Sequence, residues 1–280
     1  MVMEDFKEAV TLLGKRPVLW VPGIVAGLLA IALWILYNIS GTFFASRLLL
    51  VCWLILTLFI AGMFAVIKKN EGGIRELVSE GARHYFRVLL PQMVIVFAVM
   101  LVFVLIIITA AIVTGGVPDM IALSAVSIFI IIPTFFLTYF ADAAAVFEDQ
   151  RVFDSIRRSI ELTVTHAGEV IGFFIVSISV AVAIFLALMA VWEASLYDQL
   201  APIMNYNETQ LSALTPDQLI SLIGQNGMWV TSIVIFFGIL LALPILSTYK
   251  VCFFKKLSGM TAKSIQQTGE YDSKGRWYKY

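Results

Sequence analysis

Residues 139–150 read YFADAAAVFEDQ, and they close a run of about twenty residues, beginning at Ile121, that carries no charge before Asp142. An acidic side chain at the centre of a membrane helix costs about 2.5–3.5 kcal/mol, and less near its ends. If this run crosses lipid, Asp142 must have a partner, have a function, or lie close to water. The surroundings of Asp142 therefore decide how much function can be inferred from this stretch.

The composition of the whole chain indicates an integral membrane protein. The chain has 280 residues, of which 60% are hydrophobic and only 14% charged, and its mean hydropathy is +0.94. An ordinary soluble domain is about 25% charged. Cys52 and Cys252 lie in apolar runs near opposite ends of their spans, so we expect neither a disulfide nor a shared metal site.

Six stretches are long and apolar enough to cross a membrane, which takes about 20 residues of helix. No small-residue cleavage site follows the first stretch, so we expect an uncleaved helix and not a signal peptide. The predicted spans are residues 17–37, 47–67, 88–113, 121–147, 170–191 and 228–253.

The positions of the basic residues predict the orientation. Every Lys and Arg except Arg47 lies at a terminus, in the connections after the second and fourth spans, or, for Lys250, near the C-terminal end of the sixth span. The long loop at residues 192–227 has four acidic residues and no Lys or Arg. Because basic residues mark cytoplasmic segments, we predict a multi-pass protein of the plasma membrane with both termini cytoplasmic. The outer loop then places Asn207, in the sequon Asn-Glu-Thr, as a possible glycosylation site.

The chain also shows an internal repeat. The hairpin end AGMFAVIKKNEGG, residues 61–73, matches ADAAAVFEDQ, residues 141–150, and more loosely YKVCFFKKLSG, residues 249–259. Because each hairpin crosses twice, the units are parallel and an axis along the membrane normal is expected. We predict an all-α integral membrane protein whose six transmembrane helices form three parallel hairpin repeats. The units are residues 1–70, 71–149 and 150–256, and residues 257–280 form a cytoplasmic tail.

Each predicted hairpin is preceded by a short segment with apolar residues at helical spacing. Such a helix is amphipathic, and its apolar stripe lies in the membrane interface or against the bundle. We therefore expect charge at Phe153 or Ile156 to disturb docking far more than charge at Ser155. The stripes are Phe6, Ala9, Val10 and Leu13; Ile74, Leu77, Val78 and Tyr85; and Phe153, Ile156, Ile160 and Val164.

One stretch resembles a known family. Residues 140–176, FADAAAVFEDQRVFDSIRRSIELTVTHAGEVIGFFIV, combine an alanine-rich helix end, the pair Glu148-Asp149, and an amphipathic helix with Arg158-Ser159. This pattern resembles archaeal and bacterial multi-span proteins similar to the membrane domain of glycerophosphodiester phosphodiesterases. The resemblance covers these residues and is only topological elsewhere. It implies a fold and no activity, because that membrane domain is not the catalytic part.

A search for catalytic and metal-binding motifs favours a protein that is not an enzyme. The sequence has no His-Glu-x-x-His, Gly-x-Ser-x-Gly, phosphate-binding loop or Gly-x-Gly-x-x-Gly. Glu148 and Asp149 are adjacent, so they point about 100° apart on a helix, and we expect Glu148 to meet Arg157 or Arg158 at a helix junction. We predict no catalytic residue, metal or cofactor.

Two classes of function remain, a contact protein and a transporter. Prolines interrupt several spans, which can expose backbone to a solute, but the spans lack a continuous line of polar residues. A scaffold, accessory subunit or organiser of the lipid surface is the preferred interpretation, and a small-solute or ion transporter or channel is the alternative. The expected partners are anionic lipid headgroups at the cytoplasmic face, aided by the tail GRWYKY at residues 275–280, and a membrane protein; nucleic acid is not expected.

The repeat places Asp142 and Lys250 at nearly the same depth in the fourth and sixth spans. An ion pair between them would offset the cost of each charge, and the neighbouring alanines allow a close approach. We therefore predict a structural intramembrane ion pair that joins the second and third units. A role for Asp142 in binding a substrate or a proton is the alternative.

Overall fold

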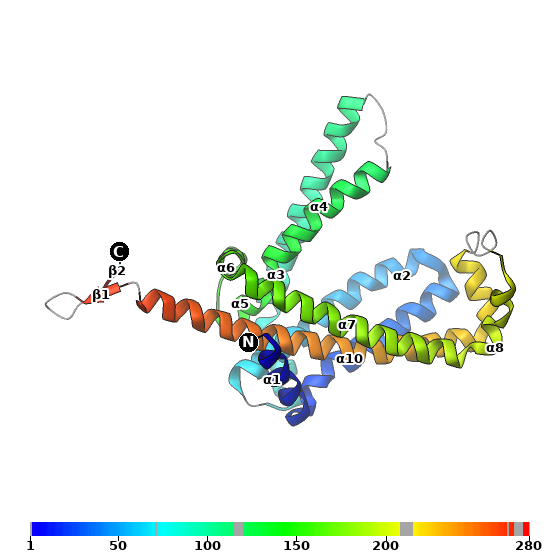
Figure 1. Ribbon diagram of the computed structural model, residues 1–280, viewed down its shortest axis with the longest axis horizontal. Coiled ribbons are helices and arrows are strands. Elements are labelled where there is room, and N and C mark those ends of the chain that lie inside the picture. Colours follow the sequence, from blue (N-terminus) through cyan, green and yellow to red (C-terminus); the bar gives the residue numbers. More distant parts are fainter. Residues whose placement is uncertain are drawn as a thin grey trace.

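The computed structural model describes residues 2–70, 72–114, 120–207, 215–267, 269–271 and 277–279. Nearly all of these residues are helical, and two three-residue strands pair antiparallel near the C-terminus (Figure 1). The elements are α1 Val2–Lys15, η1 Pro17–Trp20, α2 Val21–Lys69, α3 Ile74–Thr114, α4 Met120–Thr138, α5 Ala141–Phe147, α6 Val152–Thr165, α7 Ala167–Ser195, α8 Tyr197–Leu200, η2 Ala201–Asn205, α10 Pro216–Gln267, β1 Gly269–Tyr271 and β2 Trp277–Lys279.

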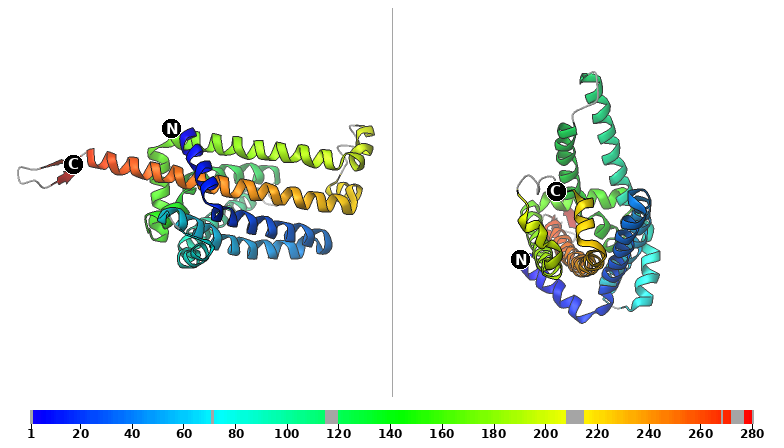
Figure 2. Two further views of the ribbon diagram at one scale, coloured as in Figure 1. Left: turned by 90° about the horizontal axis from the view of Figure 1, so that it is seen from below. Right: turned by 90° about the vertical axis from the view of Figure 1, so that its right-hand side faces the viewer.

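Among the described residues, five helices are long and apolar enough to cross a membrane. The first of them, α2, folds back on itself, so that two arms lie side by side (Figure 2). The fold-back occurs at Gly41, which has φ 71° and ψ −172°. A positive φ costs glycine little because it has no Cβ.

Two predicted boundaries between elements are wrong. The expected interfacial helix and third span of the second unit form one continuous helix, α3, which passes through Pro91. The predicted fourth span is instead broken into α4 and α5. Ser159 of α6 stabilises this break, because its Oγ donates to the carbonyl oxygen of Leu137 at 2.8 Å and accepts from the N–H of Phe140 at 3.0 Å. Backbone groups freed inside a membrane need such partners.

The core lies where the three returning arms end, just before the charged residues of each hairpin end. Residues 61–67 of α2, 140–146 around α5, and 248–254 of α10 are all buried. Because seven consecutive helical residues face every direction around a helix, each segment is enclosed on all sides. We name these three ranges the buried segments. They are joined by packing of α2 against α5 and α10, and by the Phe140 ring, whose centroid lies 5.8 Å from that of Phe253 and 6.4 Å from that of Phe254.

The helical segments predicted to precede each hairpin pack around the buried segments in a cyclic order. The first turns of α3 lie against the end of α2, α6 lies against α5, and α1 lies against α10. The first of these contacts is so close that a Cβ on Gly62 would overlap the carbonyl oxygen of Leu77, and one on Gly81 would overlap that of Leu58. The N-terminal helix thus packs on the last hairpin and closes the ring.

The expectation that Phe153 docks against the bundle more than Ser155 is wrong, whereas a place for the stripe of α6 in the membrane interface stays a prediction. Ser155 is 0% exposed, as is Ser159, whereas Phe153 is 73% and Val164 is 64% exposed. The small hydroxyl side chains fit against the neighbouring helices. Ser159 bonds the backbone at the break before α5, and Ser155 Oγ donates to the carbonyl oxygen of Val152 within α6 at 2.8 Å. A charge at Ser155, not at Phe153, is therefore expected to disturb docking.

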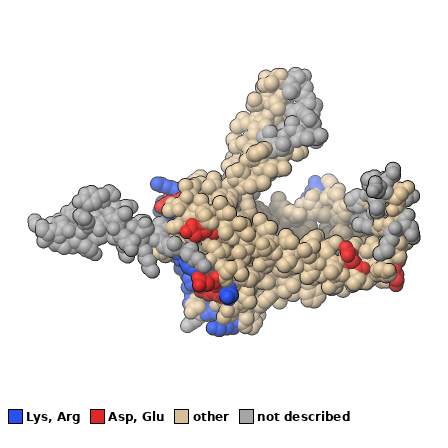
Figure 3. Space-filling view, in the orientation of Figure 1, with Lys and Arg blue, Asp and Glu red and all other residues tan. Residues whose placement is uncertain are grey.

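The charged and apolar parts of the molecule are separated. Lys, Arg, Asp and Glu gather around α1 and α6, and the elongated remainder of the face in Figure 3 is largely free of them. The α3–α4 hairpin diverges from α2, α7 and α10 as it leaves this end (Figure 1).

Candidate functional site: a buried ion pair between two cavities

Asp142 and Lys250 form an ion pair inside the bundle, as the repeat predicted. Lys250 Nζ lies 2.7 Å from Asp142 Oδ1 and donates to Oδ2 at 2.8 Å. Asp142 stands in the first turn of α5, immediately after the break that follows α4, and Lys250 lies in the buried segment of α10. The break fixes the start of α5 and therefore the depth at which the carboxylate meets the ammonium.

The immediate surroundings hold the pair in place. Asp142 Oδ1 also accepts the N–H of Ala143 at 2.7 Å. Lys250 Nζ lies 4.2 Å from the ring centroid of Tyr139 and 5.9 Å from that of Phe64, distances that allow cation–π attraction. Both charged residues are 8% exposed, so each is nearly enclosed but keeps a small accessible surface.

That accessible surface faces two cavities. One has a volume of about 630 Å³ and lies between the two arms of α2 and α10. The other has a volume of about 330 Å³ and lies among α2, α3 and α4. Trp53, Tyr139, Asp142 and Lys250 line both, so the ion pair is the polar feature that the two cavities share.

The arrangement suits recognition and positioning better than covalent chemistry. Each charge neutralises the other, so neither is held ready as an isolated base or acid. Within the described residues, no group of three or more His, Cys, Asp or Glu side chains is placed to hold a metal ion. Cys52 lines the larger cavity, Cys252 lies in the buried segment of α10, and both are free thiols.

The helix junction predicted around Glu148 is formed with Arg158. Arg158 Nε donates to Glu148 at 3.0 and 3.2 Å and so joins α6 to the end of α5. Arg158 Nη1 also lies 3.5 Å from Glu161. Arg157, the other predicted partner, is exposed on the opposite side of α6.

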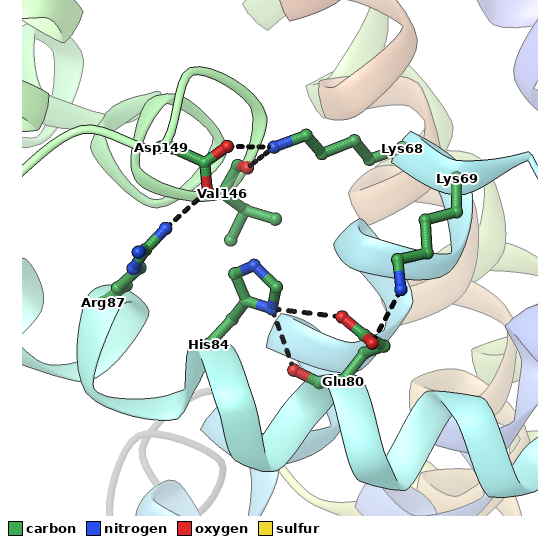
Figure 4. A network of polar contacts seen from close by, with 7 residues as sticks. All are labelled: Lys68, Lys69, Glu80, His84, Arg87, Val146 and Asp149. Atoms are coloured by element: carbon green, nitrogen blue, oxygen red, sulfur yellow. Dashed lines mark hydrogen bonds and ion pairs between the residues drawn. The ribbon is translucent and has the colours of Figure 1, made fainter.

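A second charged cluster joins the first two hairpins and was not predicted (Figure 4). Lys68 Nζ donates to the carbonyl oxygen of Val146 at 2.8 Å and to Asp149 at 2.6 Å, and Arg87 also pairs with Asp149. The hydrogen bond from Lys68 is the main cause that lowers the pKa of Asp149. Asp149 has a φ of 52°, so these two cations hold an acidic residue in a left-handed conformation.

Figure 4 also shows the contact between the end of α2 and the first turns of α3. Lys69 Nζ donates to Glu80 Oε1 at 2.7 Å, and His84 Nδ1 lies 3.0 Å from the carbonyl oxygen of Glu80. The signal for this cluster was present in the aligned hairpin ends, because Lys68-Lys69 of the first unit correspond to Glu148-Asp149 of the second. Opposite charges at corresponding positions of neighbouring units favour pairing.

The contact of α1 with α10 was also missed by sequence reasoning. Lys256 Nζ donates to Asp5 Oδ1 at 2.8 Å, and the Tyr249 hydroxyl donates to the carbonyl oxygen of Val2 at 3.3 Å. Phe6 meets the Tyr249 ring edge-on, with centroids 5.5 Å apart. These partners are more than 240 residues apart in the sequence, and no local pattern connects them.

Two predicted surface features lie at the edge of the described chain. The Asn207 side chain is exposed after η2, but the rest of its sequon, residues 208 and 209, lies outside the described residues. Residues 275, 276 and 280 of the tail also lie outside them. Before the tail, α10 continues beyond the predicted domain end to Gln267.

Comparisons with known proteins place the chain in a family. Searches of curated proteins and of solved structures give no match. The family model described as "Domain of unknown function (DUF7847)" matches residues 1–257, which include both members of the ion pair, all three buried segments and the cyclic contact of α1 with α10. The chain therefore belongs to the DUF7847 family.

Proposed function

We propose that this protein is a non-enzymatic membrane protein that acts through contacts at the cytoplasmic membrane surface, as a scaffold or an organiser of lipid. In this proposal it spans the plasma membrane six times as three hairpin units with both termini cytoplasmic. The helix α1, the first turns of α3, and α6 form a collar at headgroup level. Anionic lipids are the partners of the collar, and the resemblance to a phosphodiesterase membrane domain concerns the fold alone.

One observation carries the proposal, which is the inverted amphipathic character of α6. A helix on a soluble protein buries its apolar stripe and exposes polar residues. In α6 the buried face holds three hydroxyl side chains, those of Ser155, Ser159 and Thr163, beside Leu162, and the exposed face holds Phe153 and Val164. This distribution is favourable if the exposed face lies in lipid, where an apolar face of an interfacial helix is buried.

Exposed basic residues flank the same face. Arg151 and Arg157 are exposed on or beside α6, and Arg75 and Arg83 are exposed on the first turns of α3. A basic residue close to an anionic leaflet contributes about 1 kcal/mol of attraction. The collar thus combines apolar anchors with cations, which is the combination that binds an anionic lipid surface.

The proposal is tested by measuring the depth of α6 in a bilayer. Cys52 and Cys252 are replaced by Ala, a single cysteine is placed at Phe153, Val164 or Asp154, and a fluorophore attached there is quenched by lipids spin-labelled near the headgroup. We expect strong quenching at positions 153 and 164 and weak quenching at the exposed polar control, position 154. Equal, weak quenching at all three positions would place the face in water and contradict the proposal.

Transport of a small solute is the second candidate, and the two cavities beside the ion pair favour it. A solute path needs polar groups reachable from more than one side, and Asp142 and Lys250 line both cavities. In proteoliposomes, a contact protein gives no flux above empty vesicles. A reproducible flux that Asp142→Ala abolishes would replace the contact function by transport.

A further inference from the structure

The larger cavity has the shape and lining of a binding site for a molecule with an apolar chain and one polar end. Its volume of about 630 Å³ lies within the range of about 300–1,000 Å³ found for small-molecule sites. Aliphatic side chains line most of it, among them Leu29 and Leu33 of the first α2 arm, Leu56 of the second and Leu243 of α10. The charged groups that line it, Asp142 and Lys250, are paired with each other, and Ser247 adds a hydroxyl one helical turn from Lys250.

The chemistry of the ion pair selects the polar end of the ligand. An ammonium has three N–H donors and a carboxylate has about four acceptor positions. Lys250 directs at most two donors to the two oxygens of Asp142, and Asp142 takes one more from the N–H of Ala143. One donor and about one acceptor position are left, which is the complement of a hydroxyl group, since a hydroxyl both donates and accepts.

A charged head group fits this site less well. A ligand carboxylate would compete with Asp142 for Lys250, and a ligand ammonium would compete with Lys250 for Asp142. In each case one charge of the pair would be left uncompensated inside the bundle, which is strongly unfavourable. An uncharged hydroxylic group leaves the pair intact.

The smaller cavity extends the polar end in a second direction. It reaches the same ion pair from the side of α3 and α4, where Gln92 and Thr138 line it. An amide and a hydroxyl there provide further partners for a head group with more than one hydroxyl. Of these two cavities, the larger has the aliphatic lining that suits the apolar chain.

We propose that the cavity between the two arms of α2 and α10 binds an uncharged, long-chain amphiphile, with its hydroxyl group at Asp142 and Lys250 and its alkyl chain along Leu29, Leu33 and Leu243. The bilayer supplies such molecules directly to the cavity. The site lies inside the bundle and is independent of the collar of interfacial helices.

Trp53 provides the readout because it lines both cavities. The full-length protein in detergent is titrated with a dibrominated long-chain alcohol, whose bromines quench nearby indole fluorescence. The carboxylic acid and the quaternary ammonium of the same chain are titrated in parallel at neutral pH. We expect saturable quenching by the alcohol at a concentration at least tenfold lower than for either charged analogue. Trp53→Phe is expected to remove the saturable quenching and to leave the weak quenching of the other tryptophans, which rises linearly with concentration.

A cavity-filling variant tests the position of the chain. Ala30 lines the larger cavity and does not contact the ion pair, so Ala30→Leu is expected to weaken quenching by the alcohol at least fivefold. The matched change Ala183→Leu, on an exposed face of α7, is expected to have no effect. Saturable quenching by either charged analogue at a lower concentration than by the alcohol would overturn the proposed ligand class. Absence of saturation with the wild-type protein, or saturation retained in Trp53→Phe, would overturn the site itself.

Discussion

The inner layer of the bundle, which holds the three buried segments, and the distal half, which lies farther along the long helices, pack in different ways. In the inner layer the buried segments are enclosed on every face. In the distal half, the most apolar windows of α3 and α7 have no buried residue, and the α3–α4 hairpin diverges from the other helices (Figure 1). Hydrophobicity alone therefore does not decide where these helices associate.

The difference follows from the solvent. Lipid tails are as apolar as Leu or Ile side chains, so apolar helices gain little by leaving lipid for one another. Association requires small residues that allow backbone contact, or polar groups that need partners. The inner layer has both, in Gly62 with Gly81 and in Asp142 with Lys250, whereas the distal half consists mainly of large aliphatic side chains.

The largest effect on stability is expected at the ion pair. Asp142→Asn leaves the buried Lys250 ammonium without its carboxylate, and Lys250→Met leaves the buried Asp142 carboxylate without its ammonium. Removing one member of a buried pair costs about 3–5 kcal/mol. We expect a marked fall in the thermal midpoint of each variant in detergent, and a partial recovery in the double variant. The control Arg87→Met breaks a pair with Asp149 in which both side chains are about half exposed, and exposed pairs contribute only about 0–1 kcal/mol.

Strictly additive losses in the double variant would show that Asp142 and Lys250 do not stabilise the layer as a pair. A different pattern identifies a functional carboxylate. In that case Asp142→Asn keeps nearly the full thermal midpoint but loses flux or ligand binding, and Lys250→Met does not restore it.

A smaller effect is expected at the closest helix crossing. A Cβ at Gly62 overlaps the carbonyl oxygen of Leu77, and inserting atoms into a packed site costs about 1–3 kcal/mol. Gly62→Ala should therefore lower the thermal midpoint. Gly14→Ala is the matched control in α1, because no atom lies within 4 Å of the added Cβ, and alanine favours helix over glycine by about 1 kcal/mol. If both variants are equally stable, close backbone contact is not what holds the layer together.

The smallest effect concerns pH. The hydrogen bond from Lys68, with the charges of Lys68 and Arg87, lowers the pKa of Asp149. A carboxyl group whose folded pKa is below its unfolded value, about 3.9 for Asp, stabilises the protein above that value and loses the contribution as the pH falls through the folded pKa. The Asp149 side chain is 56% exposed, so this contribution is at most about 1 kcal/mol.

Asp149→Asn tests this contribution with little disturbance of the backbone, because Asn also tolerates a left-handed conformation. The thermal midpoint of the variant should be slightly lower than that of the wild type at pH 7, and the two should converge below pH 4. A difference that stays constant from pH 7 to pH 3 would mean that the charge of Asp149 does not stabilise the junction.

Sequence reasoning went furthest where a single helix carries the signal. Long apolar runs predict helices in lipid whatever their neighbours are. The aligned hairpin ends, by sequence alone, place Asp142 and Lys250 at one depth. It failed where burial depends on a second helix. Phe153 was expected to dock better than Ser155 because the apolar spacing was interpreted as the docking face, but the face of α6 that packs against its neighbours holds Ser155 and Ser159.

The amino-acid sequence by itself determined the membrane class, the apolar helices and the two charges that must find partners in lipid, because the cost of a charge or an unpaired backbone group in hydrocarbon is a property of each residue. Only the tertiary structure decided that Ser159 satisfies the break before α5, that α1 closes the ring on α10, and that the ion pair borders two cavities. Each of these depends on the distance between atoms far apart in the sequence. Packing geometry fixes such distances, and no local pattern of residues encodes them.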